Sequence, residues 1–335
     1  MKRAMIVVLL FSLFFGIGPK EVTAAGQAWA VIDADTGRLL DGANENIRLP
    51  IASLTKIWTA LTYIESGTPS GDVLISPQAA SAEGSSLYLK QGLTIHSDAL
   101  LYGLMLRSGN DAAHALAEHA GGSSEGFVEL MNTKALYYGL NDTVFTNPSG
   151  LHDDRHLSTA YETALIMHYA MKNDKFREIA TTKKHVYRGA EQTFSWRNKH
   201  RLLHSDSNAI AGKTGFTKAA GRTLVTYFEK EGKKVIVVTL NDGDDWNTHR
   251  QLADKVFSSY DLLTVAKKGT YAILPGIEAE LRTPIRLLLK KGEKEKLSNV
   301  VRIPRGKNER SLGLWSVSLD TEQLITTEIT IRQLR

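Results

Sequence analysis

The sequence predicts an α+β fold followed by a smaller all-β region. Short apolar strands occur at both ends of residues 26–260, amphipathic helices occupy the middle of that range, and alternating apolar and polar residues return after residue 265. Strands from distant parts of a chain, separated by helices, form an antiparallel sheet that the helices cover. We therefore expect a sheet with a helical subdomain in residues 26–262 and a β-rich domain in residues 263–335.

Composition and charge limit the possible classes of protein. The chain has 335 residues, enough for about two domains. It is 42% hydrophobic and 23% charged, which is typical of a globular protein and excludes a mainly disordered chain. It contains no cysteine, so disulfides, thiolate metal sites and a cysteine nucleophile are excluded. The net charge is +5, and residues 265–335 hold 14 Lys and Arg against 8 Asp and Glu, so the excess lies near the C-terminus.

The first 25 residues have the pattern of an export signal. Lys2 and Arg3 precede the apolar run Ala4–Ile17, and small residues follow at Ala24 and Ala25. This order is typical of a secretory signal peptide. A run of 14 residues spans about 21 Å of helix, short of the ~30 Å apolar core of a bilayer. We expect an exported, extracytoplasmic protein, either secreted or held at the outer membrane face or cell wall, with no nucleic-acid partner.

The elements of the first domain follow from local patterns. Asp35-Thr36-Gly37 forms a turn between strands at 28–32 and 38–41. Apolar residues then recur three and four positions apart, which predicts helices. Later they alternate with a period of two, which predicts a hairpin before a last helix. The expected helices cover residues 53–66, 97–107, 111–120, 125–136, 159–171 and 248–260, and the hairpin strands cover 224–228 and 235–240.

The region after residue 265 is expected to be a small β domain. Pro275, Pro284 and Pro304 separate short apolar runs, and Ile329 and Ile331 alternate with polar residues. Its basic charge suggests peripheral contact with an anionic membrane or wall. Solubility alone would explain the same charge, and the sequence leaves both interpretations open.

Ser53 and Lys56 start the first helix with the pattern S-x-x-K. Residues three apart on a helix share a face, and negative charge is stabilised at a helix N-terminus. At its ordinary pKa of about 10.4 a lysine amine is almost fully protonated at neutral pH and so is a poor proton acceptor, but burial beside other cations lowers that pKa and lets the amine accept a serine proton. A helix cap followed by a solvated lysine would have the same pattern.

Two further motifs have chemical potential. Ser108-Gly109-Asn110 lies between two helices, where a hydroxyl and an amide can project into a cleft, although both residue types also cap helices. Lys213-Thr214-Gly215 precedes the hairpin. A strand edge with these residues can pair with an extended peptide and bind its carboxylate, and glycine permits close approach. An ordinary exposed strand end would look the same.

In this order the three motifs resemble the signature of the penicillin-interacting serine enzymes: S-x-x-K, S-x-N, K-T-G. The chain is most similar to the low-molecular-mass penicillin-binding proteins, the D-alanyl-D-alanine carboxypeptidases. The resemblance implies a β-lactamase/transpeptidase-like catalytic domain and extends loosely to the β domain. Besides the three motifs, the stretches that carry it are residues 84–90, 146–151, 158–160, 211–217 and 220–222.

The resemblance also implies catalytic roles. Ser53 would attack the carbonyl between two terminal D-alanines of a peptidoglycan stem peptide, and Lys56 would take its proton. Ser108 would relay a proton to the leaving nitrogen, and Asn110 would position Lys56 or the substrate amide. Backbone N–H groups of Ser53 and Phe216 would hold the oxyanion. β-Lactams would acylate the same serine and stall.

Substrate binding would use the K-T-G strand. Lys213 and Thr214 would hold the terminal carboxylate, and Gly215 would let the substrate approach. Relatives use a further cation after this strand, for which His249 and Arg250 are the candidates here. No cofactor and no metal are implied.

Three rival functions remain for comparison. A class A β-lactamase needs a deacylating glutamate in an E-x-x-L-N pattern, but Tyr137 occupies that position before Leu140-Asn141. A transpeptidase would use the same residues and differ only in the acceptor. A silent wall-binding protein would not need Lys56 behind its serine.

A metallopeptidase is disfavoured by helical geometry. His114 and His119 are five residues apart, which on a helix puts them about 140° out of phase, so both cannot bind one metal. His152 and His156 are expected in a polar loop beside the cleft.

Overall fold

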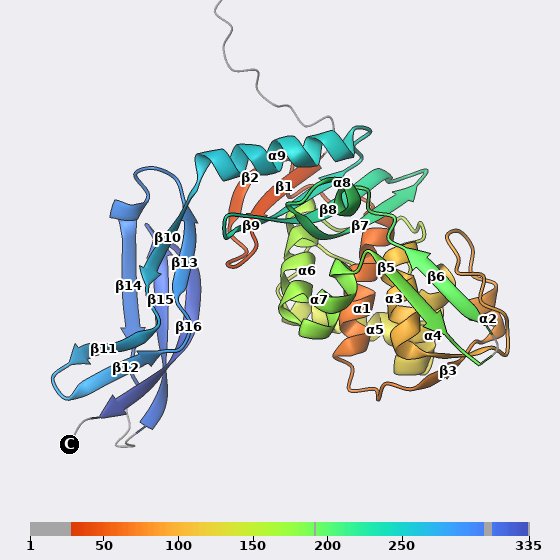
Figure 1. Cartoon of the computed structure of the whole chain (residues 1–335), viewed down its shortest axis with the longest axis horizontal. Coiled ribbons are helices and arrows are strands. Elements are labelled where there is room, and N and C mark those ends of the chain that lie inside the picture. Colours follow the sequence, from red (N-terminus) through yellow and green to blue (C-terminus); the bar gives the residue numbers. More distant parts are fainter. Residues whose placement is uncertain (1–27, 191, 305–309, 334–335) are drawn as a thin grey trace, which may run out of the picture.

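The computed structural model describes residues 28–190, 192–304 and 310–333. Within them a part that mixes sheet and helices is followed by an all-β region, which confirms the expected fold class (Figure 1). The expected signal segment, residues 1–25, lies outside the described residues. Among the described helices, none has the length and apolar character to span a bilayer.

A five-stranded antiparallel sheet lies at the centre of the first part. β1 pairs with β9, so the N-terminal strand lies beside a strand some 200 residues later, as expected. Among the described strands, β7 lies at the edge of this sheet and pairs with a strand on one side only. In spatial order the strands are β2 (Leu39–Ala43), β1 (Ala28–Asp33), β9 (Lys233–Leu240), β8 (Gly221–Lys230) and β7 (Ala209–Thr217).

Both faces of this sheet are covered. Ala30 and Ile32 of β1 pack in the core shared with the main group of helices, while Trp29 and Val31 pack on the opposite side with α9 (Asp245–Ser259). Figure 1 shows α9 on one side of the sheet and α1 and α6 on the other. Because side chains alternate along a strand, burial on both faces explains the continuous apolar run of β1.

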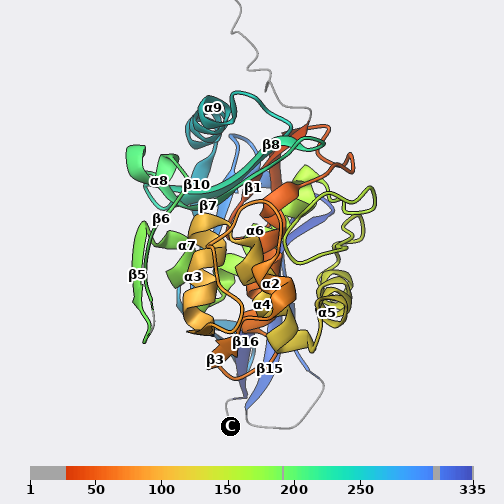
Figure 2. The same cartoon turned by 90° about the vertical axis from the view of Figure 1, so that its right-hand side faces the viewer.

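The main helices lie close to their expected positions. α1 is the central one, with Ile57, Trp58 and Leu61 fully buried and the Trp58 indole N–H donating to the Met131 carbonyl at 2.9 Å. α3, α4 and α6 all pack against it, and Figure 2 shows α3 and α4 on the side of the molecule that faces the viewer. These helices are α1 (Thr55–Ile64), α3 (Ser97–Arg107), α4 (Asn110–Gly121), α5 (Ser124–Tyr137) and α6 (Ala160–Lys172).

Several elements differ from expectation. The first helix was expected to begin at Ser53, but a 3₁₀ turn, η1 (Ala52–Leu54), precedes α1. α9 begins at Asp245, three residues before the predicted start at Thr248. The Asp245 side chain is buried and pairs with Arg222, and the apolar periodicity used for the prediction does not detect a buried polar residue. The other elements that the sequence analysis did not predict are α2 (Pro77–Ala80), α7 (Asp174–Thr181), α8 (Leu202–Ser205), β3 (Asp72–Leu74), β4 (Thr94–His96), β5 (Lys184–Arg188) and β6 (Thr193–Arg197).

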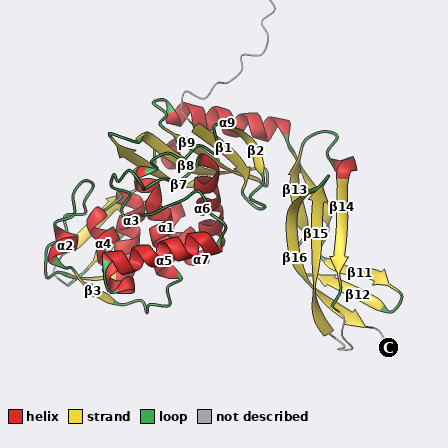
Figure 3. Cartoon of the chain, turned by 180° about the vertical axis from the view of Figure 1, so that it is seen from behind, coloured by secondary structure: helices red, strands yellow, loops and turns green. Residues whose placement is uncertain are grey.

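The C-terminal region consists of strands around their own core (Figure 3). Ile329 and Ile331 point into that core with Trp315, as their alternation predicts. A short 3₁₀ turn, η2 (Lys294–Lys296), precedes β14. The strands are β10 (Asp261–Ala266), β11 (Gly269–Leu274), β12 (Ile277–Leu281), β13 (Ile285–Leu289), β14 (Leu297–Arg302), β15 (Arg310–Leu319) and β16 (Glu322–Gln333).

A nearly buried ion pair joins the two regions. The Arg38 guanidinium, just before β2, donates to both carboxylate oxygens of Glu293 at 3.1 and 2.6 Å and contacts the Leu288 carbonyl at 3.3 Å. Leu288 itself packs in the core beneath α9. The β region is therefore attached through side chains as well as through the chain connection after α9.

Candidate active site

Ser53 and Lys56 meet where η1 passes into α1. Lys56 is fully buried, and its Nζ lies 3.0 Å from Ser53 Oγ. The same nitrogen lies 2.7 Å from Asn110 Oδ1 and 2.5 Å from the Ser149 carbonyl oxygen. Burial, with the nearby charge of Lys199, lowers the pKa of Lys56 to about 7. A large fraction of the amine is thus unprotonated near neutral pH, and it contacts the serine hydroxyl.

The Ser108–Asn110 turn brings a second hydroxyl to the site. Ser108 ends α3 with a left-handed backbone (φ 66°), and α4 begins at Asn110. Its hydroxyl lies 2.9 Å from Lys213 Nζ. The Asn110 amide donates to the Glu83 carbonyl at 2.5 Å, which leaves its Oδ1 directed at Lys56. The turn therefore links the two lysines through side chains that each hydrogen-bond one of them.

The K-T-G segment forms part of edge strand β7. Lys213 is buried, and its Nζ also donates to the Thr214 carbonyl at 2.8 Å. A Cβ at Gly215 would lie 2.9 Å from the Ser53 backbone nitrogen and 2.4 Å from Thr223 Oγ1, so glycine is required for the strand to pass this close to the serine. Phe216 follows with an exposed ring. The strand thus borders the serine with its unpaired edge.

These residues surround one cleft of about 500 Å³. Lys56, Asn110 and Lys213 lie behind its wall and reach it through Ser53 and Ser108. The structure therefore brings together Ser53, Lys56, Ser108, Asn110 and the K-T-G segment from Lys213 to Phe216, but not the candidate cations His249 and Arg250. The lining consists of Ser53, Ser85, Ser108, Lys199, Thr214, Gly215, Phe216, Arg222, Thr223, Asp245 and Trp246.

The expected extra cation was assigned to the wrong residues. His249 is fully buried away from the cleft between Thr226 Oγ1 (2.8 Å) and Thr239 Oγ1 (3.1 Å), and burial holds its pKa well below the ordinary value. Arg250 does not line the cleft either and contacts Ser205 at 3.2 Å. Both lie on α9 after Asp245 and Trp246, the residues of this helix that line the cleft.

Two cations that the sequence reasoning missed do line it. Arg222 stands opposite Phe216 in the β7–β8 pairing and forms a two-point contact with Asp245, at 3.1 Å through Nε and 2.5 Å through Nη2. Lys199 is exposed and lies 3.4 Å from Ser85 Oγ. The sequence could have indicated Arg222, because it follows the turn after the K-T-G segment. In an antiparallel hairpin the next strand runs back beside the first and passes the same cleft.

Two loops fix the groups around Lys56. The Asn147 side-chain oxygen accepts the backbone N–H groups of Ser149, Gly150 and Leu151, which aims the Ser149 carbonyl at the lysine. The buried carboxylate of Asp111 accepts backbone N–H groups of residues 87 and 89, which holds the segment that carries Ser85. The lining of the cleft is therefore set by buried polar contacts.

The histidines considered for metal binding have other partners. His114 Nδ1 contacts Ser124 Oγ and His119 Nδ1 contacts the Tyr63 hydroxyl, both at 2.9 Å. His156 was expected in a polar loop but is buried under the active site. Within the described ranges, no cluster of three or more metal-ligating side chains occurs.

Comparison with known proteins agrees with this geometry. A family model described as D-alanyl-D-alanine carboxypeptidase matches residues 17–244. The chain is 33% identical over 293 residues to the D-alanyl-D-alanine carboxypeptidase DacF of Bacillus subtilis. The aligned region covers 82% of this chain and 75% of that protein.

Solved structures show the same fold. Penicillin binding protein 5 from Haemophilus influenzae matches with a TM-score of 0.75 at 22% identity, over 94% of this chain and 99% of that one. A mutant of the Streptomyces K15 DD-transpeptidase matches with a TM-score of 0.66 at 31% identity, over 70% of this chain and 97% of that one. Because the family model spans most of the chain and the fold agrees over nearly its whole length, the chain belongs to the D-alanyl-D-alanine carboxypeptidase family, whose members are serine-type hydrolases.

Proposed function

We propose that this protein removes the terminal D-alanine from peptidoglycan stem peptides through an acyl-enzyme on Ser53. The observation that carries the proposal is the placement of Lys56 Nζ among Ser53 Oγ, Asn110 Oδ1 and the Ser149 carbonyl. A neutral amine has two N–H groups and one lone pair. The amide and carbonyl oxygens can only accept, so they take the N–H groups, and the lone pair is left for the serine hydroxyl.

Acylation follows from this arrangement. Lys56 accepts the Ser53 proton as Oγ attacks the D-alanyl carbonyl carbon. The resulting oxyanion would lie between the backbone N–H groups of Ser53 and Phe216, which the close approach allowed by Gly215 supports. Because the pKa of Lys56 is about 7, much of the amine is neutral near pH 7 and can act as the general base.

Ser108 would protonate the leaving amine. Lys213 Nζ donates to Ser108 Oγ at 2.9 Å, so the hydroxyl proton of Ser108 is free to point into the cleft. As the C–N bond breaks, that proton would pass to the leaving nitrogen, and the proton that Lys56 took from Ser53 would replace it on Ser108, which leaves Lys56 neutral again. Water would then attack the ester while Lys56 accepts its proton, and Lys56 would return a proton to Ser53 Oγ as the ester bond breaks.

The substrate carboxylate would bind at the cationic end of the cleft. Burial, and then the charges of Lys56 and Lys199, lower the pKa of Lys213 well below its ordinary value. Among the described residues, Lys213 Nζ hydrogen-bonds the Ser108 hydroxyl and the Thr214 carbonyl, which carry no charge, and a substrate carboxylate would supply a compensating negative charge. Thr214 and Arg222 add a hydroxyl and a guanidinium at the same end of the cleft.

Location and domain roles belong to the same proposal. Residues 1–25 would direct export, residues 26–262 would carry catalysis, and residues 263–335 would rest on the anionic membrane or wall. The excess of Lys and Arg after residue 265 supports the last point. Deleting residues 263–335 should reduce pelleting with cell envelopes, and unchanged pelleting would contradict it.

D-Alanine release from diacetyl-L-lysyl-D-alanyl-D-alanine tests the activity. We expect release by the wild type and none from Ser53→Ala or after penicillin treatment. A stable penicillin adduct on Ser53 without release would instead indicate a transpeptidase. Rapid turnover of penicillin would indicate a β-lactamase with a deacylating base other than the expected glutamate.

A further inference from the structure

Trp246 lies at the cationic end of the active-site cleft and has no role in the proposed chemical steps. Its half-buried side chain lines the cleft together with Arg222 and Asp245. It follows Asp245 directly in the first turn of α9. Two consecutive residues of one helix therefore stand beside the arginine that is expected to bind the substrate carboxylate.

Asp245 and Trp246 constrain the Arg222 guanidinium in different ways. Asp245 accepts from Nε at 3.1 Å and from Nη2 at 2.5 Å, which occupies one edge of the group. The guanidinium carbon lies over the Trp246 ring, 5.8 Å from its centroid, a distance typical of a cation–π contact. Asp245 thus fixes one edge of the guanidinium, and Trp246 bounds it on another side. Neither contact uses the Nη1 N–H groups, which are left to donate to a substrate carboxylate.

A buried histidine holds the indole in turn. The His200 ring packs edge-on against Trp246, with ring centroids 5.2 Å apart. His200 Nε2 lies 3.1 Å from the Val225 carbonyl oxygen, and because a carbonyl can only accept, this nitrogen carries the ring proton and donates it. A Cβ at Gly212 would lie 2.5 Å from the same nitrogen, so glycine is needed for the imidazole to reach the sheet. The indole therefore packs against a ring that is hydrogen-bonded to β8.

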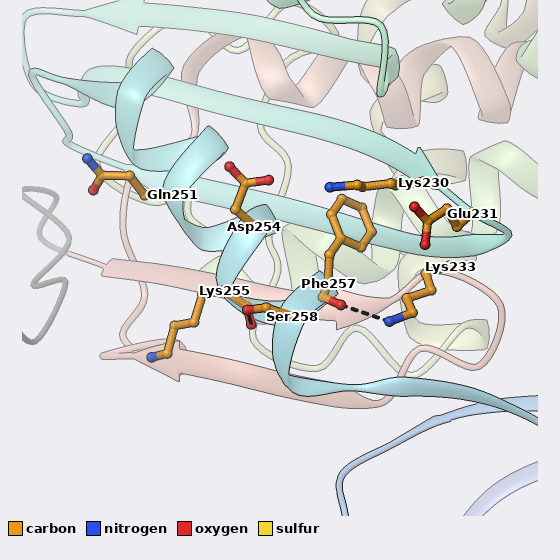
Figure 4. Close-up of a pocket in the computed structure, with 8 residues that line it drawn as sticks. All are labelled: Lys230, Glu231, Lys233, Gln251, Asp254, Lys255, Phe257 and Ser258. Carbon is orange, nitrogen blue, oxygen red and sulfur yellow. Dashed lines mark hydrogen bonds between the residues drawn. The ribbon is translucent and has the colours of Figure 1, made fainter. Parts of the chain in front are cut away.

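α9 is attached to the sheet in its middle and at its C-terminal end. His249, in the middle of the helix, hydrogen-bonds one threonine of β8 and one of β9. Figure 4 shows the C-terminal end, where Lys233 of β9 donates to the Phe257 carbonyl at 2.8 Å. A cation at that end also matches the negative end of the helix dipole. The first turn of α9 is therefore held against the sheet, in which β8 carries Arg222.

We propose that Trp246 is a positioning residue for substrate binding, which holds the Arg222 guanidinium where it meets the terminal carboxylate. This rests on the proposed function. Guanidinium and carboxylate groups bind through hydrogen bonds of defined direction, and any freedom that the guanidinium has before binding must be lost on binding. Trp246 acts on substrate affinity and leaves proton transfer at Ser53 unchanged. Its loss should therefore raise KM and leave kcat as it is.

Arg201 provides a matched control on the same ring. Its guanidinium carbon lies over the Trp246 ring, 5.9 Å from the centroid, almost the same distance as that of Arg222. Arg201 is exposed and does not line the cleft. Replacing it therefore changes the surroundings of the indole and the local charge, but it keeps the cation that is expected to bind the substrate.

The test measures steady-state D-alanine release from the diacetylated tripeptide. Leucine and phenylalanine are both smaller than tryptophan, but only phenylalanine keeps a ring face for the cation. We expect Trp246→Leu to raise KM about fivefold with kcat unchanged, Trp246→Phe to recover most of this loss, and Arg201→Gln to match the wild type. In the Arg222→Gln background, Trp246→Leu should cause no further rise in KM. If Trp246→Leu does not fold, Trp246→Met takes its place.

Four results would overturn the proposal. They are a fall in kcat as large as the rise in KM, a phenylalanine variant as weak as the leucine variant, an equal rise in KM for Arg201→Gln, and additive effects of Trp246→Leu and Arg222→Gln. The rate of Ser53 acylation by penicillin, which also carries a carboxylate, gives a second readout for the same variants. If the wild type releases no D-alanine, that result counts against the proposed function, and the penicillin series still decides the role of Trp246.

Discussion

Thr55 Oγ1 lies 2.7 Å from His156 Nε2, although 101 residues separate them in the chain. His156 Nδ1 accepts the Thr146 backbone N–H at 3.1 Å, so the ring proton must be on Nε2 and points at Thr55. The Thr55 hydroxyl in turn donates to the Ala52 carbonyl at 2.8 Å. This chain of hydrogen bonds ends at the residue before the nucleophile.

Ala52 requires such support because its backbone is left-handed, with φ 49°. Gly150 packs against the same carbonyl so closely that a Cβ there would lie 2.0 Å from its oxygen. The conformation of Ala52 sets the direction of the Ser53 N–H, one of the two proposed oxyanion donors. His156 is buried and does not line the cleft, so we expect it to act as a positioning residue.

Replacing His156 should slow acylation more than it weakens substrate binding. We expect His156→Ala to lower kcat by roughly ten- to a hundredfold with a smaller change in KM, because the oxyanion donor is displaced. His156→Gln places an amide N–H near the position of Nε2 and should recover part of the loss. Steady-state kinetics on the tripeptide and the rate of penicillin acylation measure the effect. Equal activity of both variants and the wild type would contradict the positioning role.

The pH profile should report the titration of Lys56. Burial lowers its pKa to about 7, and only the neutral amine can accept the serine proton. We expect kcat/KM to fall about tenfold for each pH unit below 7 and to level off above it. The rate of acylation by penicillin should follow the same curve, since the same base acts. A profile that is flat between pH 5.5 and 7.5 would assign the proton transfer to another group.

The contribution of Arg222 to substrate binding can be measured separately from its contribution to stability through Asp245. Arg222→Gln should raise KM about tenfold with little change in kcat, because a cation at the carboxylate end is lost. It also leaves the Asp245 carboxylate, only 4% exposed, without its partner, so stability should fall. Arg222→Gln with Asp245→Asn removes the orphaned charge. The double variant should regain thermal stability and keep the raised KM, whereas recovery of both would mean that Arg222 acts only through folding.

Contacts within the site that depend on local spacing could be predicted from the sequence. Contacts between side chains from distant segments could not be predicted from the residue pattern alone. Ser53 and Lys56 are three residues apart, so their contact follows from helical geometry. The meeting of Ser108 with Lys213 across 105 residues came from the family resemblance. The contact of Arg222 with Asp245 had no signal, because strand alternation does not say which charges face each other.

The same reasoning explains the errors about histidine. His156 stands among Asp153, Asp154 and Arg155, so the local pattern is that of a solvated loop. Its burial depends on α1, more than a hundred residues earlier, which local composition cannot report. His249 was considered as a ligand for the substrate, yet the start of α9 at Asp245 turns it into the protein, beneath the sheet.

These buried histidines should make the fold sensitive to mild acid. Burial lowers the pKa of His156 and of His168 to about 4 and that of His200 to about 3. An unfolded histidine titrates near 6.5, so the unfolded chain takes up protons first. Their contribution to stability is complete above about pH 6.5 and is lost as the pH falls towards 4. Each such histidine costs on the order of 3 kcal/mol once the pH is below its folded pKa.

His168 offers a clean test of this linkage. Its Nδ1 lies 2.8 Å from the Ala34 carbonyl, so asparagine can keep that hydrogen bond without being able to take up a proton. We expect His168→Asn to lose less stability than the wild type between pH 6.5 and 4.5, measured as the urea midpoint at each pH. Ordinary carboxylates titrate mainly below this window. His152, half-exposed beside Asp154, provides the control, and His152→Asn should keep the wild-type slope. A His168→Asn protein with the full wild-type slope would show that the acid sensitivity arises elsewhere.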